Sequence, residues 1–260
     1  MRIFFLLLSL MVGCVSAAPR LAIIIDDVGN DYAAAQKVLN LPSEVTVAIL
    51  PQLGNSQRIA EQAHRRGHEV MLHQPMQPVN NKKLGPGGLD QWQSKSEQQA
   101  VLVKNLQSLP HVSGINNHMG SLLTRNEEAM KWVMQGLKQH GDLYFVDSRT
   151  VDNTQAERVA RNEGIPSARR DVFLDNIAEA DHIQMQLESA LQLARLRGSA
   201  IAIGHPYPET LAVLAKMLPQ WQEEGVVLLP VSQIIAHQRS ADSWHASSSL
   251  LPQVAKNSKQ

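Results

Sequence analysis

Cysteine, aromatic residues and excess charge are all scarce in this 260-residue chain. Cys14 is the single cysteine and lies in the N-terminal segment, so the chain after it has no disulfide bond to form. Aromatic residues make up only 4% of the sequence, which gives no indication of a dedicated sugar-stacking surface. The 24 Lys and Arg residues balance 24 Asp and Glu residues, which argues against a nucleic-acid surface and a polyanion-binding face.

Several common catalytic motifs are also missing from the sequence. No G-x-S-x-G segment supplies a serine nucleophile elbow, and no phosphate-binding loop or G-x-G-x-x-G segment supplies a nucleotide site. The sequence therefore favours neither a serine hydrolase of that type nor a nucleotide-dependent enzyme.

The one long apolar run stands at the N-terminus, in "MRIFFLLLSLMVGCVSAAP". Arg2 precedes an apolar core that is too short for a comfortable transmembrane span, and small residues follow it. We predict a signal peptide over residues 1–18, cleaved near Ala17 or Ala18, and export to the periplasm with no transmembrane segment in the mature chain. Two alternatives are an uncleaved anchor and lipidation at Cys14.

Short apolar runs alternate with helical patterns along the rest of the chain. The runs are typical of parallel strands that are covered on both faces, and they lie at 21–26, 45–50, 69–73, 143–147, 172–175, 199–204 and 226–231. Helical patterns lie between them at 56–67, 96–109, 126–141, 178–198 and 208–225. This alternation predicts an α/β fold with one parallel sheet, either open or closed, and the number of strands favours a barrel.

Two segments do not follow this alternation. Residues 77–94 form a long loop rich in Gly, Pro and Asn, which is either a functional or a mobile loop. Residues 237–260 are polar and rich in serine, so we expect a disordered tail there. The predicted organisation is thus a leader, a single domain over residues 19–236 and a tail.

Side chains able to carry chemistry occur where the predicted strands end. Those positions are Asp26, Asp27, His73, Asn116, Asn117, His118, Asp147, Ser148, Arg149, Asp175 and His205. Because the carboxyl ends of parallel strands meet at one rim, we expect a functional site there. His68 lies five residues before His73 on the same strand, so period-two alternation turns it to the other face and indicates a structural role.

The adjacent carboxylates in "LAIIIDDVGN" indicate what kind of site this is. Asp26 and Asp27 repel each other at the end of a buried run, and a divalent cation would offset that repulsion. One Asp and two His form a ligand set of catalytic Zn²⁺ with a position left for water, and a second Asp can act as general base. The pattern predicts a catalytic zinc site with a general base beside it.

Four segments carry a resemblance to a known family. "IIDDVG" (24–29) resembles the first motif of the NodB-type polysaccharide deacetylases, and "GHEVMLHQPMQ" (67–77) is similar to the second. "AIGHP" (202–206) resembles the fifth motif, and "GINNHMGS" (114–121) is similar to the divergent branch of that family. The resemblance spans residues 20–236 and implies an irregular (β/α)7-type barrel, the NodB homology fold, in a single domain.

The resemblance also implies roles for individual residues. Asp26 would be the catalytic base and His205 the catalytic acid, while Asp27 and His73 would bind the metal. The ordinary family has its second metal histidine at the position of Gln77, and we infer that His118 replaces it.

Supporting roles follow from the same comparison. Asp147 or Asp175 would orient His205, and the sequence does not decide between them. Arg149 or Arg170 would neutralise a nearby carboxylate, and Asn117 belongs with these supporting residues.

The resemblance implies an exported enzyme that removes N-acetyl groups from an amino-sugar polysaccharide. Its partner would be a glycan substrate, either peptidoglycan or an exopolysaccharide, rather than a nucleic acid. Two alternatives are a catalytically impaired protein that binds glycan or acts as a periplasmic scaffold, and a metal-dependent esterase or phosphoesterase using the same ligands.

Overall fold

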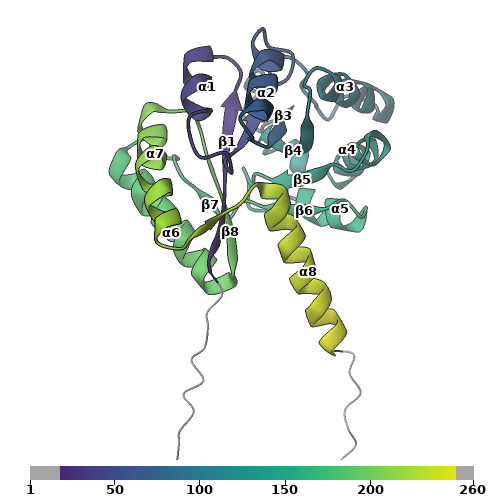
Figure 1. Ribbon diagram of the computed structural model, residues 1–260. Helices are drawn as coiled ribbons and strands as arrows, with labels where there is room; N and C mark the ends of the chain where they lie inside the picture. Colours follow the sequence, from purple (N-terminus) through teal and green to yellow (C-terminus); the bar gives the residue numbers. More distant parts are fainter. Residues whose placement is uncertain (1–17, 250–260) are drawn as a thin grey trace, which may run out of the picture.

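A sheet of parallel strands, curled into an open barrel, forms the centre of the molecule in the computed structural model (Figure 1). The structure describes residues 18–249, without the side chains of 241–249. The strands are β1 (Arg20–Val28), β2 (Thr46–Ile49), β3 (Val70–Met76), β4 (Val112–Met119), β5 (Tyr144–Asp147), β6 (Ser167–Arg169), β7 (Val172–Phe173), β8 (Ser199–Gly204) and β9 (Val227–Leu228). Their order is β6-β5-β4-β3-β2-β1-β8-β7, and β9 pairs with β1.

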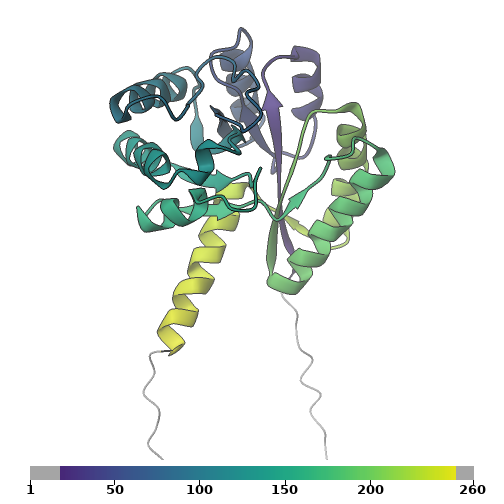
Figure 2. The same cartoon turned by 180° about the vertical axis from the view of Figure 1, so that it is seen from behind.

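Helices surround this sheet, and all but the last of them cover its outer face (Figures 1 and 2). They are α1 (Tyr32–Val38), α2 (Ser56–Arg65), α3 (Lys95–Gln107), α4 (Glu127–His140), α5 (Ala156–Asn162), α6 (Ala180–Arg197), α7 (Pro208–Glu223) and α8 (Val231–Ser249), with a 3₁₀ turn η1 (Leu123–Arg125) before α4. Local sequence explains where several begin: Asp31 caps α1, and Ser94 and Glu97 form a capping box at α3. The five predicted helices are confirmed as α2, α3, α4, α6 and α7, whereas the short α1 and α5 were not predicted.

The two faces of the sheet have separate cores. The larger core lies between the sheet and the outer helices and includes Ile23, Ile25 and Leu72. The smaller core fills the concave face, where Ile24 and Met71 point in the opposite direction. This arrangement explains why the strands are apolar on both faces, as parallel strands covered on both sides require.

Helix α8 closes the amino end of the concave face. Val231, Ile234 and Ile235 are buried there against the smaller core. The first turn of the helix is also held by the Glu69 carboxylate, which accepts hydrogen bonds from the Ser232 amide and the Tyr144 hydroxyl. The carboxyl ends of the strands are left as the open end of the barrel.

The expected α/β barrel in a single domain is therefore confirmed, as a curled half-barrel. The predicted disorder of residues 237–260 is wrong for 237–249, which continue α8, while 250–260 lie outside the described residues. The predicted leader lies outside them too, apart from residue 18. Within the described part, no helix is both long enough and apolar enough to cross a membrane.

Candidate metal centre

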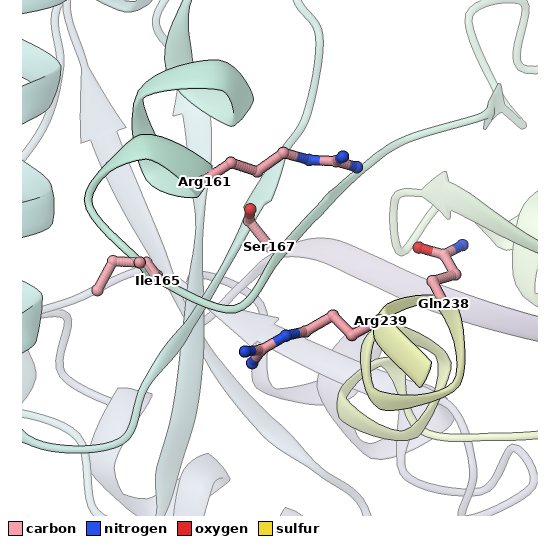
Figure 3. A pocket seen from close by; sticks show the side chains of 6 residues that line it. Arg161, Ile165, Ser167, Gln238 and Arg239 are labelled. Carbon is pink, nitrogen blue, oxygen red and sulfur yellow. The ribbon is translucent and has the colours of Figure 1, made fainter. Parts of the chain in front are cut away.

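A cavity of about 330 Å³ opens at the carboxyl ends of the strands. Its walls come from the ends of β1, β3, β4 and β8 and from the segment that follows β5. A second hollow, of about 250 Å³, lies between β6, the loop before it and α8, and Figure 3 shows Arg161, Ser167 and Arg239 around it. Among the residues whose side chains the structure describes, no carboxylate or imidazole lines the second hollow, and metal ligands come together in the first.

Three ligand atoms, from β1, β3 and β4, converge in the first cavity. Asp27 Oδ1 lies 3.0 Å from His73 Nε2 and 2.7 Å from His118 Nδ1, and the two ring nitrogens are 3.2 Å apart. Ligand atoms about 2.0–2.1 Å from a tetrahedral Zn²⁺ would be about 3.3 Å from one another. The Asp-His-His set therefore has the chemistry and nearly the spacing of three ligands of such a cation, which leaves a fourth position for water.

The strands place these residues in a simple way. Parallel pairing sets His73 of β3 beside Asn116 of β4, and His118 lies two residues further along β4 on the same face. Asp27 has a positive φ of 57°, so the chain of β1 turns at that residue while Asp26 keeps the extended form. The turn is one reason that neighbouring carboxylates take up different positions at the rim.

Asn116 joins the metal site to Asp26. His73 Nδ1 donates a hydrogen bond to Asn116 Oδ1 at 2.7 Å, and Asn116 Nδ2 donates to Asp26 Oδ1 at 2.7 Å. With the His73 proton on Nδ1, the lone pair of Nε2 faces the centre, as a metal ligand requires. The same amide holds Asp26, which is only 3% exposed, beside the centre.

The electrostatics separate the roles of the two carboxylates. Burial raises the pKa of Asp26, and the charges of His73 and His205 only partly oppose this effect. Burial also acts to raise the pKa of Asp27, but hydrogen bonds from His118 and His73 outweigh it and lower that pKa far below the usual range. Asp27 is thus a permanently charged ligand, whereas Asp26 has the higher proton affinity of a base.

His73 is the positive partner of these carboxylates. Burial lowers its pKa, but Asp26 and Asp27 outweigh this effect and raise the pKa to about 9. A cation entering the site would take over that stabilising charge and release the ring proton.

His205 faces the centre from β8. Its Nδ1 donates to Asp175 Oδ1 at 2.9 Å, and its Nε2 lies 3.8 Å from Asp27 Oδ2. Burial lowers the pKa of His205, but the hydrogen bond to Asp175 and the charges of Asp26, Asp175 and Asp27 together outweigh burial and raise it. Asp175 also accepts from the Thr210 hydroxyl, so the carboxylate is fixed in place. Of the two candidates for orienting His205, Asp175 is the one in contact with it.

Asp147 has a different set of partners. It accepts hydrogen bonds from the backbone N–H of Arg149, the Thr154 hydroxyl and the backbone N–H of Glu157. It therefore shapes the loop after β5 and does not contact His205, which makes the alternative assignment of Asp147 wrong on geometry.

The remaining predicted residues support the walls of the cavity. Asn117 binds backbone groups of Met119 and Ser148, so it ties β4 to the segment after β5. Arg149 lines the cavity and lies 4.0 Å from the exposed Asp152, so neither it nor Arg170 forms a close ion pair with a carboxylate of the centre.

Gln77 is occupied by a structural contact. Its side-chain oxygen accepts a hydrogen bond from the Gln91 amide, and its backbone pairs with Leu89 and Leu122. These contacts tie the 77–94 loop to the end of β3 and to the turn after β4. Gln77 is not among the residues lining the cavity, so His118 is the second imidazole that the structure brings to the centre.

The other histidines lie elsewhere, as expected for His68. It is buried, and its two ring nitrogens contact the carbonyl oxygens of Val45 and Leu39, which confirms a structural role. His64 and His111 are exposed and stack on each other with ring centroids 3.8 Å apart.

Sequence reasoning missed three contributors to the site. Asn116 was noted only as a strand-end residue, although period-two spacing to His118 already placed both side chains on one face. Phe173 and Tyr207 flank His205 with ring centroids 5.5 Å from its own, and no motif pointed to either. Of the two, Phe173 lines the cavity, which composition alone did not reveal.

Comparison with known proteins gives the family. A family model described as divergent polysaccharide deacetylase matches residues 23–235. The uncharacterized protein YibQ of Escherichia coli strain K12 is 42% identical over 201 residues, which is 77% of this chain and 63% of YibQ. The chain thus spans less than two thirds of the length of that relative.

Solved structures show the same fold. The uncharacterized protein ATU2773 of Agrobacterium tumefaciens C58 aligns with a TM-score of 0.81 at 24% identity, over 85% of this chain and 90% of that one. The catalytic domain of a peptidoglycan N-acetylglucosamine deacetylase from Eubacterium rectale aligns with a TM-score of 0.50 at 12% identity, over 82% and 88% of the two chains.

Proposed function

Because this chain belongs to the divergent polysaccharide deacetylase family, we propose that it is a metal-dependent hydrolase that removes N-acetyl groups from an amino-sugar glycan. One observation carries the proposal. Asp27, His73 and His118 converge at one point, between a buried Asp26 and a His205 held by Asp175. The set supplies a cation site, a base and an acid within one cavity, which is what amide hydrolysis needs.

The donor set fits a divalent cation, and Zn²⁺ suits two imidazoles and one carboxylate best. Such a cation, when bound, supplies Lewis-acid stabilisation of the acetamide oxygen and lowers the pKa of water. Asp27, His73 and His118 would hold it.

The residues of the chain divide the proton transfers between them. Asp26 takes a proton from the attacking water as the water oxygen bonds to the acetamide carbon. His205 gives a proton from Nε2 to the nitrogen as the carbon–nitrogen bond breaks, leaving a free amine and acetate. Asp175 keeps Nδ1 of His205 protonated and the ring in place, so Nε2 can exchange its proton with the leaving group.

The alternative of a catalytically impaired glycan-binding or scaffold protein rested on Gln77. Because His118 lies where a third ligand is needed, the geometry favours the hydrolase. The proposal also includes three finer assignments: Zn²⁺ as the metal, export to the periplasm, and peptidoglycan or an exopolysaccharide as the glycan.

Acetate release from N-acetylated chitooligosaccharides tests the proposal. We expect zinc-loaded protein to release acetate and Asp26→Asn to lower the rate by about 10²–10⁴-fold while retaining metal. A zinc-loaded wild type that binds the oligosaccharide and releases no acetate would instead establish the binding protein. Release from O-acetylated but not N-acetylated substrates would establish the esterase.

A further inference from the structure

Two arginines line the cavity that also holds the metal ligands. Arg149 follows β5, Arg170 follows β6, and both line the cavity together with Ser148. Arg170 reaches across the gap, since its Nε donates to the Ser148 carbonyl at 2.6 Å and its Nη2 donates to the Arg149 carbonyl at 2.8 Å. We call Ser148, Arg149 and Arg170 the basic wall.

The protein compensates the positive charge of this wall only in part. Burial and the charge of Arg149 lower the pKa of the Arg170 guanidinium, and the charges of Asp26 and Asp147 oppose this without outweighing it. No carboxylate lies within 4.0 Å of the Arg170 guanidinium in residues 18–240, although Phe173 stacks against it at 4.8 Å. Within the same residues Arg149 pairs only with Asp152, at 4.0 Å, and that carboxylate is fully exposed to water. Like charges held together in a partly dry wall favour a bound anion.

A buried hydroxyl points to the same conclusion independently of the charges. Ser148 is 5% exposed and its Oγ is buried, but Oγ has no hydrogen-bond partner in the described part of the chain. Buried polar groups are normally paired, so an unpaired hydroxyl on a cavity wall indicates that a ligand atom completes it. A hydroxyl that can donate, beside a guanidinium, suits an oxyanion.

The backbone of the wall is fixed for this purpose. Arg149 has a left-handed backbone with φ of 48°, an unfavourable conformation for a residue with a long side chain. Its N–H is held by Asp147 and its carbonyl by Arg170, so the loop keeps this conformation. From this strained turn Arg149 lines the cavity.

We propose that the basic wall binds an anionic substituent, a carboxylate or a phosphate, on the same glycan whose N-acetyl group reaches Asp26. The substrate is thus an acidic amino-sugar glycan rather than a neutral one. This inference rests on the proposed function for the identity of the ligand as a glycan. The zero net charge of the whole chain is consistent with it, because the basic wall is a local feature that faces carboxylates across one cavity.

Calorimetric binding to zinc-loaded Asp26→Asn protein tests the inference without turnover. The probes are the disaccharide of N-acetylglucosamine and N-acetylmuramic acid, the methyl ester of its carboxylate, and N-acetylglucosamine with and without a 6-phosphate. We expect one acidic probe to bind at least about tenfold more tightly than its neutral partner at low salt, with the ratio falling as salt rises. Whichever pair shows the difference identifies carboxylate or phosphate.

Variants of the wall assign the effect to its residues. Arg149→Gln should abolish the preference for the acidic probe, Arg149→Lys should keep part of it, and Ser148→Ala should weaken it. Arg195→Gln, at an exposed position on α6, is the matched control and should leave the preference unchanged.

Equal affinity for acidic and neutral probes, a preference that survives Arg149→Gln, or no binding by any probe would each overturn the inference. Its failure is separable from that of the proposed function. Acetate release from a neutral oligosaccharide without any acid preference leaves the deacetylase standing and removes the anion site. A preference for the acidic probe without acetate release leaves the anion site standing and removes the deacetylase.

Discussion

Replacing His118 by Ala should remove most of the metal affinity, and the effect can be worked out from the geometry. His118 supplies one of three protein atoms within 3.2 Å of one another, and Gln77 is engaged elsewhere and cannot replace it. Structural zinc sites with four ligands bind with about 10–16 kcal/mol, or about 3 kcal/mol per ligand. Losing one ligand should therefore weaken Zn²⁺ binding by about 150-fold.

Thermal unfolding converts this affinity into a measurable shift. With free Zn²⁺ at about 100 times the wild-type Kd, binding stabilises the folded wild type by about 2.7 kcal/mol. The variant, with its weaker Kd, gains only about 0.3 kcal/mol under the same conditions. For a domain of about 200 residues these values correspond to a rise in Tm of about 5–11 °C for the wild type and about 1 °C for the variant.

The assay is differential scanning fluorimetry of metal-free protein across a zinc titration, with metal content measured after desalting. His64→Ala is the matched control, because His64 is exposed on α2 and stacks on His111 outside the cavity. We expect the control to follow the wild type. The reasoning is refuted if zinc does not raise the Tm of the wild type, or if His118→Ala gains as much as the wild type does.

Three further substitutions test separate parts of the structure. Gln77→His should leave the zinc Kd within about twofold by calorimetry, since position 77 lies outside the cavity; a tenfold gain would contradict this. Asp175→Asn should lower kcat by about 10–100-fold with KM unchanged. It should also move the alkaline limb of the pH–rate profile to lower pH, because the carboxylate raises the pKa of His205; an unmoved limb would contradict its role. Tyr144→Phe removes the hydroxyl bound to Glu69 and should cost about 1–2 kcal/mol in urea unfolding while kcat is unchanged, and an unaltered midpoint would contradict that contact.

The order of strands and helices was predictable because apolar runs and helix caps are local signals. β1, β3 and β8 carry their functional residues at the carboxyl ends that the parallel sheet brings together, so Asp27, His73 and His205 could be found before any coordinates. α8 was not predictable in the same way. Its polar, serine-rich sequence resembles a disordered segment, and only the burial of Ile234 against the concave face shows why the helix starts there.

The finer contacts of the site depend on register, which the sequence does not state. Asp147 ends β5, whereas Asp175 follows β7 by two residues. His205 comes directly after β8, which pairs with β7 and not with β5, so Asp175 is the carboxylate brought beside it. Asn116 required the pairing of β3 with β4 before its bridge from His73 to Asp26 could be recognised. The residue types at strand ends can be read from the sequence, whereas the contacts between residues of different strands are known only from the tertiary structure.

Backbone strain collects at the same rim and argues for its function. Six non-glycine residues have positive φ in the described part of the chain, and Asp27, Met119 and Arg149 are three of them. All three line the cavity, at the ends of β1, β4 and β5, although a left-handed backbone costs about 1–2 kcal/mol at such residues. Folding alone does not explain why three strained residues, two adjacent carboxylates and two guanidinium groups line one cavity. A cavity that holds both a cation, as proposed for Asp27, and an anion, as proposed for Arg149, gives a reason for each of them.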